Sequence, residues 1–388
     1  MRFESDKPPV PNHQPPMSSQ PSSATVRAAV LPAPNVPPEV RSYPLPAMEE
    51  GAVLLRTIAS EVCGTDVHLH HGHLAGVPYP LIPGHVSIGS VEIVQGTVQD
   101  VEGRPILPGD VVTFLDVHGT CNACWYCLVA RATTRCPHRR VYGITYGADD
   151  GPGLAGGWSE RIYLRPQTRI IRLAEGVSPD DWIGAGCGLP TAVHAIELAR
   201  ISLGDRVLIQ GSGPVGLSAC VLALLSGAGW VGMIGAPELR LKAARRFGAD
   251  WTTDVTATTA DERKQAVRDA TGGRGADIVI EASGNPLAVP EGCELVRDAG
   301  RYVIVGQYTD HGDVAINPHL HINKKHLEIR GCWGSDFSHV YRAMEILARF
   351  GRRIDWSALI SRRYGLEEVG QALADVEAQR VVKAVIVP

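Results

Sequence analysis

Four closely spaced cysteines are the first residues in this chain with an evident chemical use. The stretch "CNACWYC" places Cys121, Cys124 and Cys127 at intervals of three residues, and Cys136 follows. Four thiolates saturate a tetrahedral zinc ion and leave no position for a substrate, so the group predicts a structural zinc site. A nucleic-acid-binding finger is disfavoured, because Asn, Trp, Tyr and Leu are interleaved and no basic recognition helix follows.

A second set of metal ligands is spread over three separate motifs. "EVCGTDVHLHHGH", "PGHVSIG" and "GAGCGLPTAVHA" contribute Cys63, His85 and Cys187, each flanked by glycine or near one at the end of an expected element. Two thiolates and one imidazole leave zinc an open fourth position, where an alcohol oxygen could lose its proton and hydride could then leave the carbon. Three histidines near the end of the first of these motifs are given no role: His70, His71 and His73.

A glycine-rich turn indicates nucleotide binding. In "RVLIQGSGPVGLSACVLALL" the pattern G-x-G-x-x-G falls on Gly211, Gly213 and Gly216, after an expected strand and at the start of an expected helix. The first glycine permits the turn, the second admits a pyrophosphate, and the third lets the helix pack on the strand. We therefore predict a dinucleotide site.

The next strand departs from that pattern. Gly235 stands where an Asp or Glu usually binds the adenosine ribose, with Glu238 and Arg240 nearby. Losing the carboxylate removes repulsion against a 2′-phosphate, yet no new side chain is evident to bind one. We expect NAD(H) to be slightly favoured with NADP(H) also accepted, and Gly235→Asp to sharpen selection for NAD.

The elements that must position these residues change in character along the chain. Residues 26–188 read as short strands broken by Gly and Pro, with the zinc lobe at about 118–140. Residues 189–326 alternate apolar strands with helical patterns, which predicts a parallel sheet covered by helices. Residues 327–388 carry a strand, two helices and a closing strand, which we expect to return to the first domain.

The length, net charge and composition of the chain exclude some classes of function. A chain of 388 residues with a net charge of −4 reads as a soluble two-domain protein, and its charge argues against a nucleic-acid partner. Its apolar runs are too short for a membrane span. Residues 1–25 are rich in Pro, Ser and Gln and lack a secretory signal, so we expect disorder there and a cytoplasmic, reducing location in which clustered thiols hold metal.

The motifs together carry a family resemblance. "CGTDVH", "PGH", "GCGLPTA" and "GSGPVG", with the four-cysteine lobe between them, resemble the zinc-dependent medium-chain alcohol dehydrogenases from residue 26 onward. The resemblance implies an α/β protein in which a GroES-like β-barrel catalytic domain accompanies a Rossmann domain with a doubly wound parallel sheet. It further implies two zinc ions per chain, a homodimer or homotetramer, and interconversion of an alcohol with its ketone or aldehyde.

The same resemblance implies roles for individual residues. Thr65 would hydrogen-bond the substrate oxygen, His68 would end a proton relay through the nicotinamide ribose, and Asp66 would orient His85. Thr191 and Val215 would pack against the nicotinamide ring, and Val305 joins them among the cofactor-binding residues.

Two departures from the family pattern leave the substrate undetermined. Val86 replaces the Glu that often follows the second ligand and lies near the metal in the family, and eight residues rather than seven separate Cys127 from Cys136. The longer spacing resembles a largely uncharacterised subgroup, so a secondary alcohol, a polyol and a cyclitol-like alcohol all remain possible substrates. The alternatives are a zinc-independent enone or quinone reductase of the same superfamily and a non-catalytic, zinc-stabilised nucleotide-binding protein.

Overall fold

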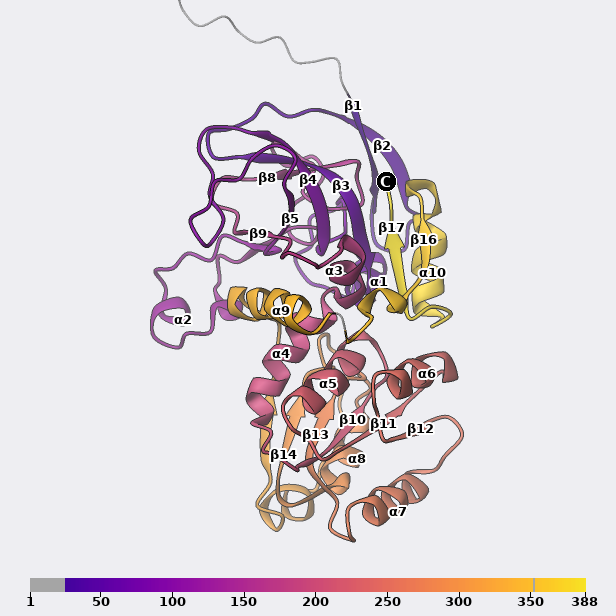
Figure 1. The fold of residues 1–388 in the computed structure, drawn as a ribbon. Helices are drawn as coiled ribbons and strands as arrows, with labels where there is room; N and C mark the ends of the chain where they lie inside the picture. Colours follow the sequence, from indigo (N-terminus) through magenta and orange to yellow (C-terminus); the bar gives the residue numbers. More distant parts are fainter. Residues whose placement is uncertain (1–24, 352) are drawn as a thin grey trace, which may run out of the picture.

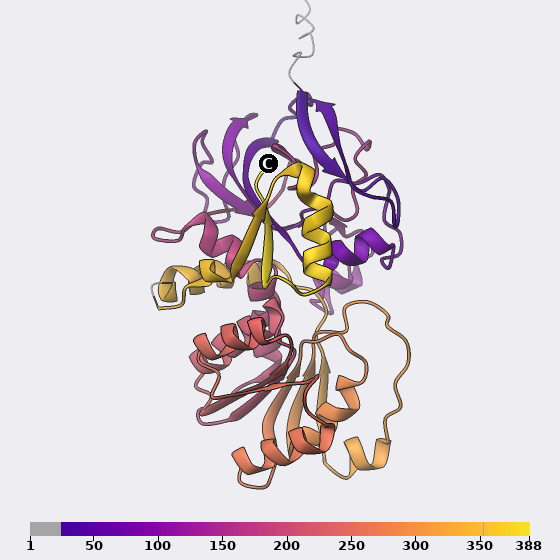
Figure 2. The same ribbon diagram turned by 90° about the vertical axis from the view of Figure 1, so that its right-hand side faces the viewer.

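The computed structural model describes residues 25–351 and 353–388. The expected disorder of residues 1–25 therefore falls, except for Thr25, outside the described residues. Figures 1 and 2 show two domains stacked on one another, with the C-terminal segment returning to the domain that contains the first strands. Within the described residues, no helix is both long and apolar enough to cross a membrane.

The first domain is built on a seven-stranded, mostly antiparallel sheet. Its strand order is β16-β17-β3-β4-β5-β9, with β8 also paired to β3. Because side chains alternate along a strand, Leu54 of β3 joins one hydrophobic core while Val53 and Leu55 join another. The strands are β3 (Val53–Val62), β4 (Ser87–Val94), β5 (Val111–Phe114), β8 (Arg161–Leu164), β9 (Ile170–Arg172), β16 (Ile360–Tyr364) and β17 (Lys383–Ile386).

Smaller elements surround this sheet. Two short antiparallel pairs are β1 (Thr25–Val30) with β2 (Glu39–Pro44) and β6 (Val117–His118) with β7 (Arg140–Val141). The helices of this domain are α1 (Gly64–His71), α2 (Trp125–Leu128), α3 (Pro179–Ala185), α9 (Phe337–Phe350) and α10 (Val369–Glu377).

The second domain holds a six-stranded parallel sheet in the order β12-β11-β10-β13-β14-β15. The strands are β10 (Arg206–Gln210), β11 (Trp230–Gly235), β12 (Trp251–Asp254), β13 (Ala276–Glu281), β14 (Val296–Ile304) and β15 (Glu328–Gly331). The helices are α4 (Gly188–Ala199), α5 (Pro214–Leu225), α6 (Glu238–Arg246), α7 (Ala260–Ala270) and α8 (Ala288–Leu295). Since the strand order reverses between β10 and β13, a ligand crevice is expected at their carboxyl ends.

This architecture confirms the predicted α/β class with a GroES-like and a Rossmann domain. One strand lies differently from the expected domain limits. β15 pairs with β14 and extends the parallel sheet to Gly331, whereas the sequence placed the return to the first domain at residue 327. The apolar run after Leu327 fits a buried strand in either sheet, so its partner could not be read from the sequence.

Candidate active site

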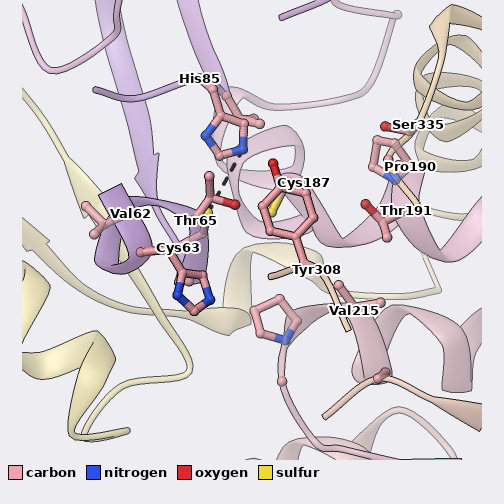
Figure 3. Close-up of a pocket in the computed structure, with 18 of the residues that line it drawn as sticks. Val62, Cys63, Thr65, His85, Cys187, Pro190, Thr191, Val215, Tyr308 and Ser335 are labelled. Carbon is pink, nitrogen blue, oxygen red and sulfur yellow. Dashed lines mark hydrogen bonds between the residues drawn. The ribbon is translucent and has the colours of Figure 1, made fainter. Parts of the chain in front are cut away.

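A cavity of ≈ 380 Å³ lies between the two domains. Its walls come from the end of β3, from the segment before β4, from α1, α3 and α4, and from the turn before α5. Figure 3 shows Cys63, His85 and Cys187 grouped on one side of this cavity, with Thr191 and Val215 farther along it. The cavity therefore joins the candidate metal ligands to the candidate nucleotide site.

Three segments bring the ligand atoms together. Cys63 follows β3 directly, His85 lies two residues before β4, and Cys187 lies between α3 and α4. Their ligand atoms all lie within 4.8 Å of one another, and Cys63 Sγ is 4.0 Å from His85 Nε2. A soft thiolate and imidazole set of this size fits a zinc ion, which binds sulfur and nitrogen at about 2.0–2.3 Å.

The pKa values of Cys63, Cys187 and His85 depend on one another. A hydrogen bond from Cys187 holds the pKa of Cys63 well below its usual value, and the same bond, with burial, raises that of Cys187. Burial opposes protonation of His85, but the Cys63 thiolate overcomes it and raises its pKa to about 10. A bound divalent cation would instead favour the deprotonated form of each group, because thiolate and neutral imidazole are the forms that bind metal.

Asp66 does not make the expected contact with His85. Its carboxylate accepts a hydrogen bond from the Cys63 N–H at 2.8 Å and caps α1. Within the described residues, the other oxygen of Asp66 and Nδ1 of His85 are both buried without a hydrogen-bond partner. Burial raises the pKa of this carboxyl well above its usual value. The observed contact of Asp66 is thus with the backbone of the first ligand.

Thr65 and His68 both line the cavity from α1. Thr65 lies two residues after Cys63 and, after Cys187 and His85, helps to lower the pKa of the Cys63 thiol, so its side chain lies near the metal ligands. His68 Nδ1 lies 3.5 Å from Nδ1 of His73, and its ring centroid is 5.5 Å from that of His311. Burial, then His311 and His73, lower the pKa of His68 below its ordinary value. The imidazole is therefore neutral at neutral pH and can accept a proton.

The three glycines of the nucleotide turn have different surroundings. A Cβ at Gly211, where φ is +109°, would lie 2.5 Å from the Ala282 carbonyl oxygen, and one at Gly216 would lie 1.9 Å from the Gly211 oxygen. At Gly213, by contrast, a Cβ would meet no other described group within 4 Å. This residue also lines the cavity. The space beside it is where a pyrophosphate could approach the start of α5.

The other residues predicted to bind the cofactor line the same cavity. Thr191, Val215, Val305 and Arg240 all contribute to its walls. Arg240 is half-buried, donates to the Val381 carbonyl at 3.3 Å, and has its pKa lowered by burial. Arg240, predicted as a cofactor-binding residue, thus lies on the wall of the cavity that also contains Gly213.

Gly235 itself has little room for a side chain. A Cβ at this position would lie 2.4 Å from Ser212 Oγ, which donates a hydrogen bond to the Ala236 carbonyl. The expectation that Gly235→Asp alone sharpens selection for NAD is thus undermined, because Ser212 would have to move first. Nearby, Glu238 is ion-paired with Arg245 at the surface.

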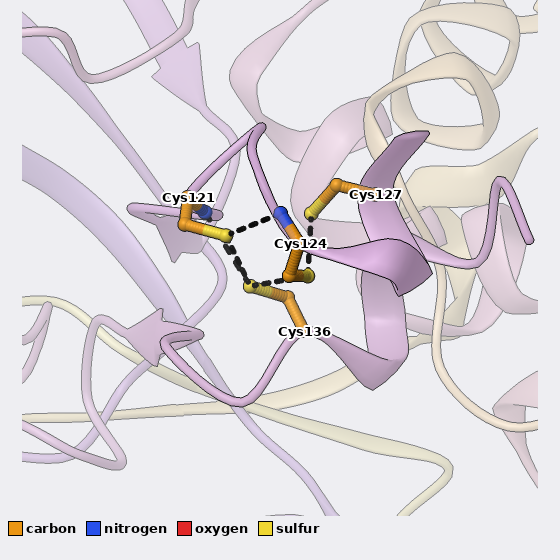
Figure 4. A group of neighbouring side chains, drawn as sticks. All are labelled: Cys121, Cys124, Cys127 and Cys136. Carbon is orange, nitrogen blue, oxygen red and sulfur yellow. Dashed lines mark hydrogen bonds between the residues drawn. The ribbon is translucent and has the colours of Figure 1, made fainter. Parts of the chain in front are cut away.

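The four-cysteine group is compact and lies away from the cavity walls. Figure 4 shows Cys121, Cys124, Cys127 and Cys136 facing a common centre. Three of the Sγ–Sγ distances are 3.6, 3.6 and 4.0 Å, close to the ~3.8 Å edge of a zinc–thiolate tetrahedron with 2.3 Å bonds. Backbone N–H groups of Ala123 and Cys124 lower the pKa of Cys121 to about 6. The geometry fits a closed metal site.

Comparisons with known proteins agree with this site. An alcohol dehydrogenase GroES-like domain model matches residues 49–175, and a zinc-binding dehydrogenase model matches residues 214–349. The 5-exo-hydroxycamphor dehydrogenase of Pseudomonas putida is 33% identical, with 93% of this chain and 98% of that protein covered. The chain belongs to the zinc-dependent medium-chain alcohol dehydrogenase family.

Solved structures of the family support the same conclusion. An alcohol dehydrogenase from Thermotoga maritima is 34% identical with a TM-score of 0.90, covering 94% of this chain and 100% of that one. A zinc-binding dehydrogenase from Sinorhizobium meliloti, bound to NADP, is 27% identical with a TM-score of 0.82, covering 94% and 100%. The chain is therefore an oxidoreductase of the alcohol dehydrogenase type.

Three residues at the site were not identified from the sequence. Tyr308, in the segment after β14, projects into the cavity beside Cys187, and burial raises its pKa to about 12. Glu61 and Lys383 form a buried pair behind the metal ligands. The available signal for this pair was a glutamate near the end of the apolar strand "LLRTIASEV" and the lysine that begins "KAVI".

Proposed function

We propose that this dehydrogenase oxidises a secondary alcohol to a ketone, or reduces the ketone, with a nicotinamide cofactor. The convergence of Cys63, His85 and Cys187 on the wall of a cavity that also reaches Gly213 carries this proposal. In the oxidation direction, the carbon loses a hydride to the cofactor and the hydroxyl loses a proton, so that the ketone, the reduced cofactor and one proton are formed. The alternative of a zinc-independent reductase leaves both ligand sets without a use.

The two polar side chains of α1 that line the cavity, Thr65 and His68, have places in this reaction. Zinc bound by the three ligands supplies a Lewis acid that lowers the pKa of the substrate hydroxyl. The Thr65 hydroxyl, beside Cys63, accepts the substrate proton and passes its own proton towards His68, which can take it because its ring is neutral. Thr191, Val215 and Val305 form the wall against which the nicotinamide ring lies.

The apolar part of the cavity wall favours a bulky apolar alcohol. Its walls include Val62, Phe114, Ile144, Trp182 and Val340. A relative that acts on a rigid bicyclic secondary alcohol, 5-exo-hydroxycamphor, is consistent with such walls. Burial of apolar surface would supply most of the binding energy for this class.

A polyol or cyclitol is the second candidate. Asp116 and Arg139 also line the cavity, and neither forms an ion pair with another described residue. Arg139 lies over the ring of Trp333 at 5.4 Å, with its Nε buried and unpartnered among the described residues. These two charged groups could hydrogen-bond the additional hydroxyls of a polyol.

The deciding experiment is a screen of NAD and NADP reduction by the metal-replete protein. Bicyclic and other apolar secondary alcohols should give kcat/KM values at least about tenfold above those of polyols and cyclitols, or about 1.4 kcal/mol. The reverse order would replace the apolar-alcohol proposal by the polyol one. Absence of turnover with every alcohol, in protein with two zinc ions bound, would contradict the proposed function.

We also propose that both cofactors are used, with a modest preference for NAD. Gly235 provides no carboxylate to repel a 2′-phosphate, while the half-buried Arg240 is the cation that could attract one. The ratio of kcat/KM for the two cofactors tests this, and a preference for NADP above about 100-fold, or roughly 2.7 kcal/mol, would contradict it. Gly235→Asp should weaken binding of both cofactors, because its Cβ would lie 2.9 Å from the Ser212 backbone nitrogen as well as against the Ser212 side chain.

We propose a cytoplasmic homodimer or homotetramer. The zinc lobe exposes four large apolar side chains, which are unusual on a monomer's surface: Trp125, Tyr126, Leu128 and Val129. A second copy of the chain would cover them. Sedimentation equilibrium of the protein and of Trp125→Asp should show a multiple of 41.5 kDa for the first and a smaller species for the second.

A further inference from the structure

A buried ion pair lies directly behind the candidate metal site. Lys383 Nζ is 2.6 Å from Glu61 Oε1, and the two side chains are 0% and 1% exposed. Among the ion pairs of the described residues this is the most deeply buried, the next being Arg263 with Glu291 at 8% and 16%. Two charges removed from water are costly unless other groups also bind them, so a pair at this depth calls for an explanation.

Strand pairing brings the two charges together next to the first ligand. β17 runs antiparallel to β3 with Val385 opposite Glu61 and Ala384 opposite Val62. Lys383 is therefore diagonal to Glu61 on the same face, within reach for long side chains. Cys63 follows two residues after Glu61, so one strand carries the carboxylate and leads directly to the first ligand.

Glu61 also binds the third ligand residue. Its Oε2 accepts a hydrogen bond from the Cys187 N–H at 2.7 Å, and its Oε1 lies 3.6 Å from Cys187 Sγ. The preceding Gly186 has φ of +51°, and a Cβ there would lie 2.1 Å from Glu61 Oε2 and 2.2 Å from Lys383 Nζ. The backbone at Cys187 is thus shaped to receive this carboxylate.

We propose that Glu61, held by Lys383, is a positioning residue for the catalytic metal: it fixes Cys187 as a ligand and thereby slows loss of the ion. The Lys383 charge balances the carboxylate, so that Glu61 can lie beside the Cys187 thiolate without adding net negative charge. Val86, next to His85, offers no carboxylate for this purpose. The inference rests on the proposed function, because it requires a metal ion at Cys63, His85 and Cys187.

The test is the rate at which zinc leaves the full-length protein into an excess of a chromogenic chelator. The two zinc ions should leave in two kinetic phases, and Cys63→Ser identifies the phase that belongs to the catalytic site. Glu61→Gln should speed that phase by about 10- to 100-fold, the usual cost of removing a group that holds a metal ligand. The phase of the four-cysteine site should not change.

The double variant Glu61→Gln with Lys383→Met separates positioning from general stability. It leaves no unpaired buried charge, so it should fold even if the single variant does not. Equally fast zinc loss from the double variant supports the proposal, and a return to the wild-type rate overturns it. Glu291→Gln is the matched control, since it breaks the next most buried ion pair far from the metal ligands, and its release rates should equal those of the wild type.

The outcomes also distinguish this inference from the proposed function. If Glu61→Gln and the double variant release zinc at the wild-type rate while Cys63→Ser lacks one zinc ion, only the inference is wrong. If Cys63→Ser binds as much zinc as the wild type, the metal assignment itself is wrong and the proposed function falls with it.

Discussion

The four-cysteine site takes its ligands from residues 121–136, whereas the cleft site takes Cys63, His85 and Cys187 from segments that span more than 120 residues. The first site is partly exposed on a lobe built of short helices and turns. The second is largely buried and opens on a cavity between domains. A local ligand set can order only its own loop, while a distant set can bind metal only after the whole domain has folded. Four ligands saturate a metal ion at the first site, which can then only stabilise the lobe. Three ligands leave a position open at the second site, where a substrate can react.

Breaking the cleft site should give the largest effect. Cys63→Ser and His85→Ala should each lower kcat by about 10³-fold or more, because several kcal/mol of polarisation is lost and 1.36 kcal/mol corresponds to about tenfold. Cofactor binding, measured by fluorescence titration, should remain close to that of the wild type. Cys220→Ser is the matched control, since Cys220 is a buried cysteine in α5 outside both ligand sets. Near-normal turnover in Cys63→Ser would show that the metal assignment is wrong.

Breaking the four-cysteine site should instead affect stability. Cys124→Ser should weaken zinc binding there by more than ~100-fold, because even residues that only support a ligand cost about 10- to 100-fold. Metal analysis should then find one zinc ion in place of two, and the melting temperature should fall, since metal binding contributes to folding of the lobe. The kcat of the remaining folded protein should be unchanged. A loss of turnover equal to that of Cys63→Ser, in folded protein, would contradict the separation of roles.

A smaller effect is expected from the proton path, which only the cleft site needs. At pH values below 8, His68→Ala should slow oxidation by roughly 10- to 100-fold. This loss is at the low end of the contribution of positioned proton transfer, or somewhat smaller. Higher pH should restore part of the rate, because hydroxide can then take the proton. His70→Ala, on the same helix but not among the cavity-lining residues, is the control. A loss that does not depend on pH would indicate a structural role for His68.

The smallest effect concerns the pH at which this path operates. His68 accepts a proton only as the neutral ring, so the rate falls as pH decreases through its pKa. Burial, His311 and His73 hold that pKa below 6.5 by disfavouring the imidazolium ion. His73→Ala should therefore raise the pKa towards 6.5 and move the acid limb of kcat/KM to higher pH, with an unchanged plateau. A pH profile from about 5 to 8 is the measurement, and an unmoved limb would contradict the role of His73.

Local patterns in the sequence were sufficient for much of this molecule. The glycine turn at Gly211 and the thiol spacing from Cys121 to Cys136 act within short segments, so residue type and spacing alone predict their structure. The fold class followed from the change of periodicity along the chain. The family and its oxidoreductase class followed from the ordered motifs, and the comparisons confirmed them.

Long-range contacts could not be predicted in this way. The pairing of Glu61 with Lys383 joins residues 322 positions apart and depends on which strand lies beside β3. Asp66 caps α1 through the Cys63 N–H, because a carboxylate three residues into a helix reaches the start of that helix before it reaches His85. The crowding of Gly235 by Ser212 arises between the end of β11 and the turn after β10, and it has no signature in either segment.

The pairing of β17 with β3 also has a consequence for the order in which the protein matures during translation. The stretch Ser60–Val62, which leads to Cys63, acquires its neighbour only when residues 384–386 leave the ribosome. Until then this edge of β3 is open, and an open strand edge can pair with other nascent chains. The zinc lobe has no such delay, since its ligands emerge within one short segment. A product that terminates before residue 383 would contain an intact lobe and nucleotide domain, but its cleft would lack the strand and the lysine that complete it.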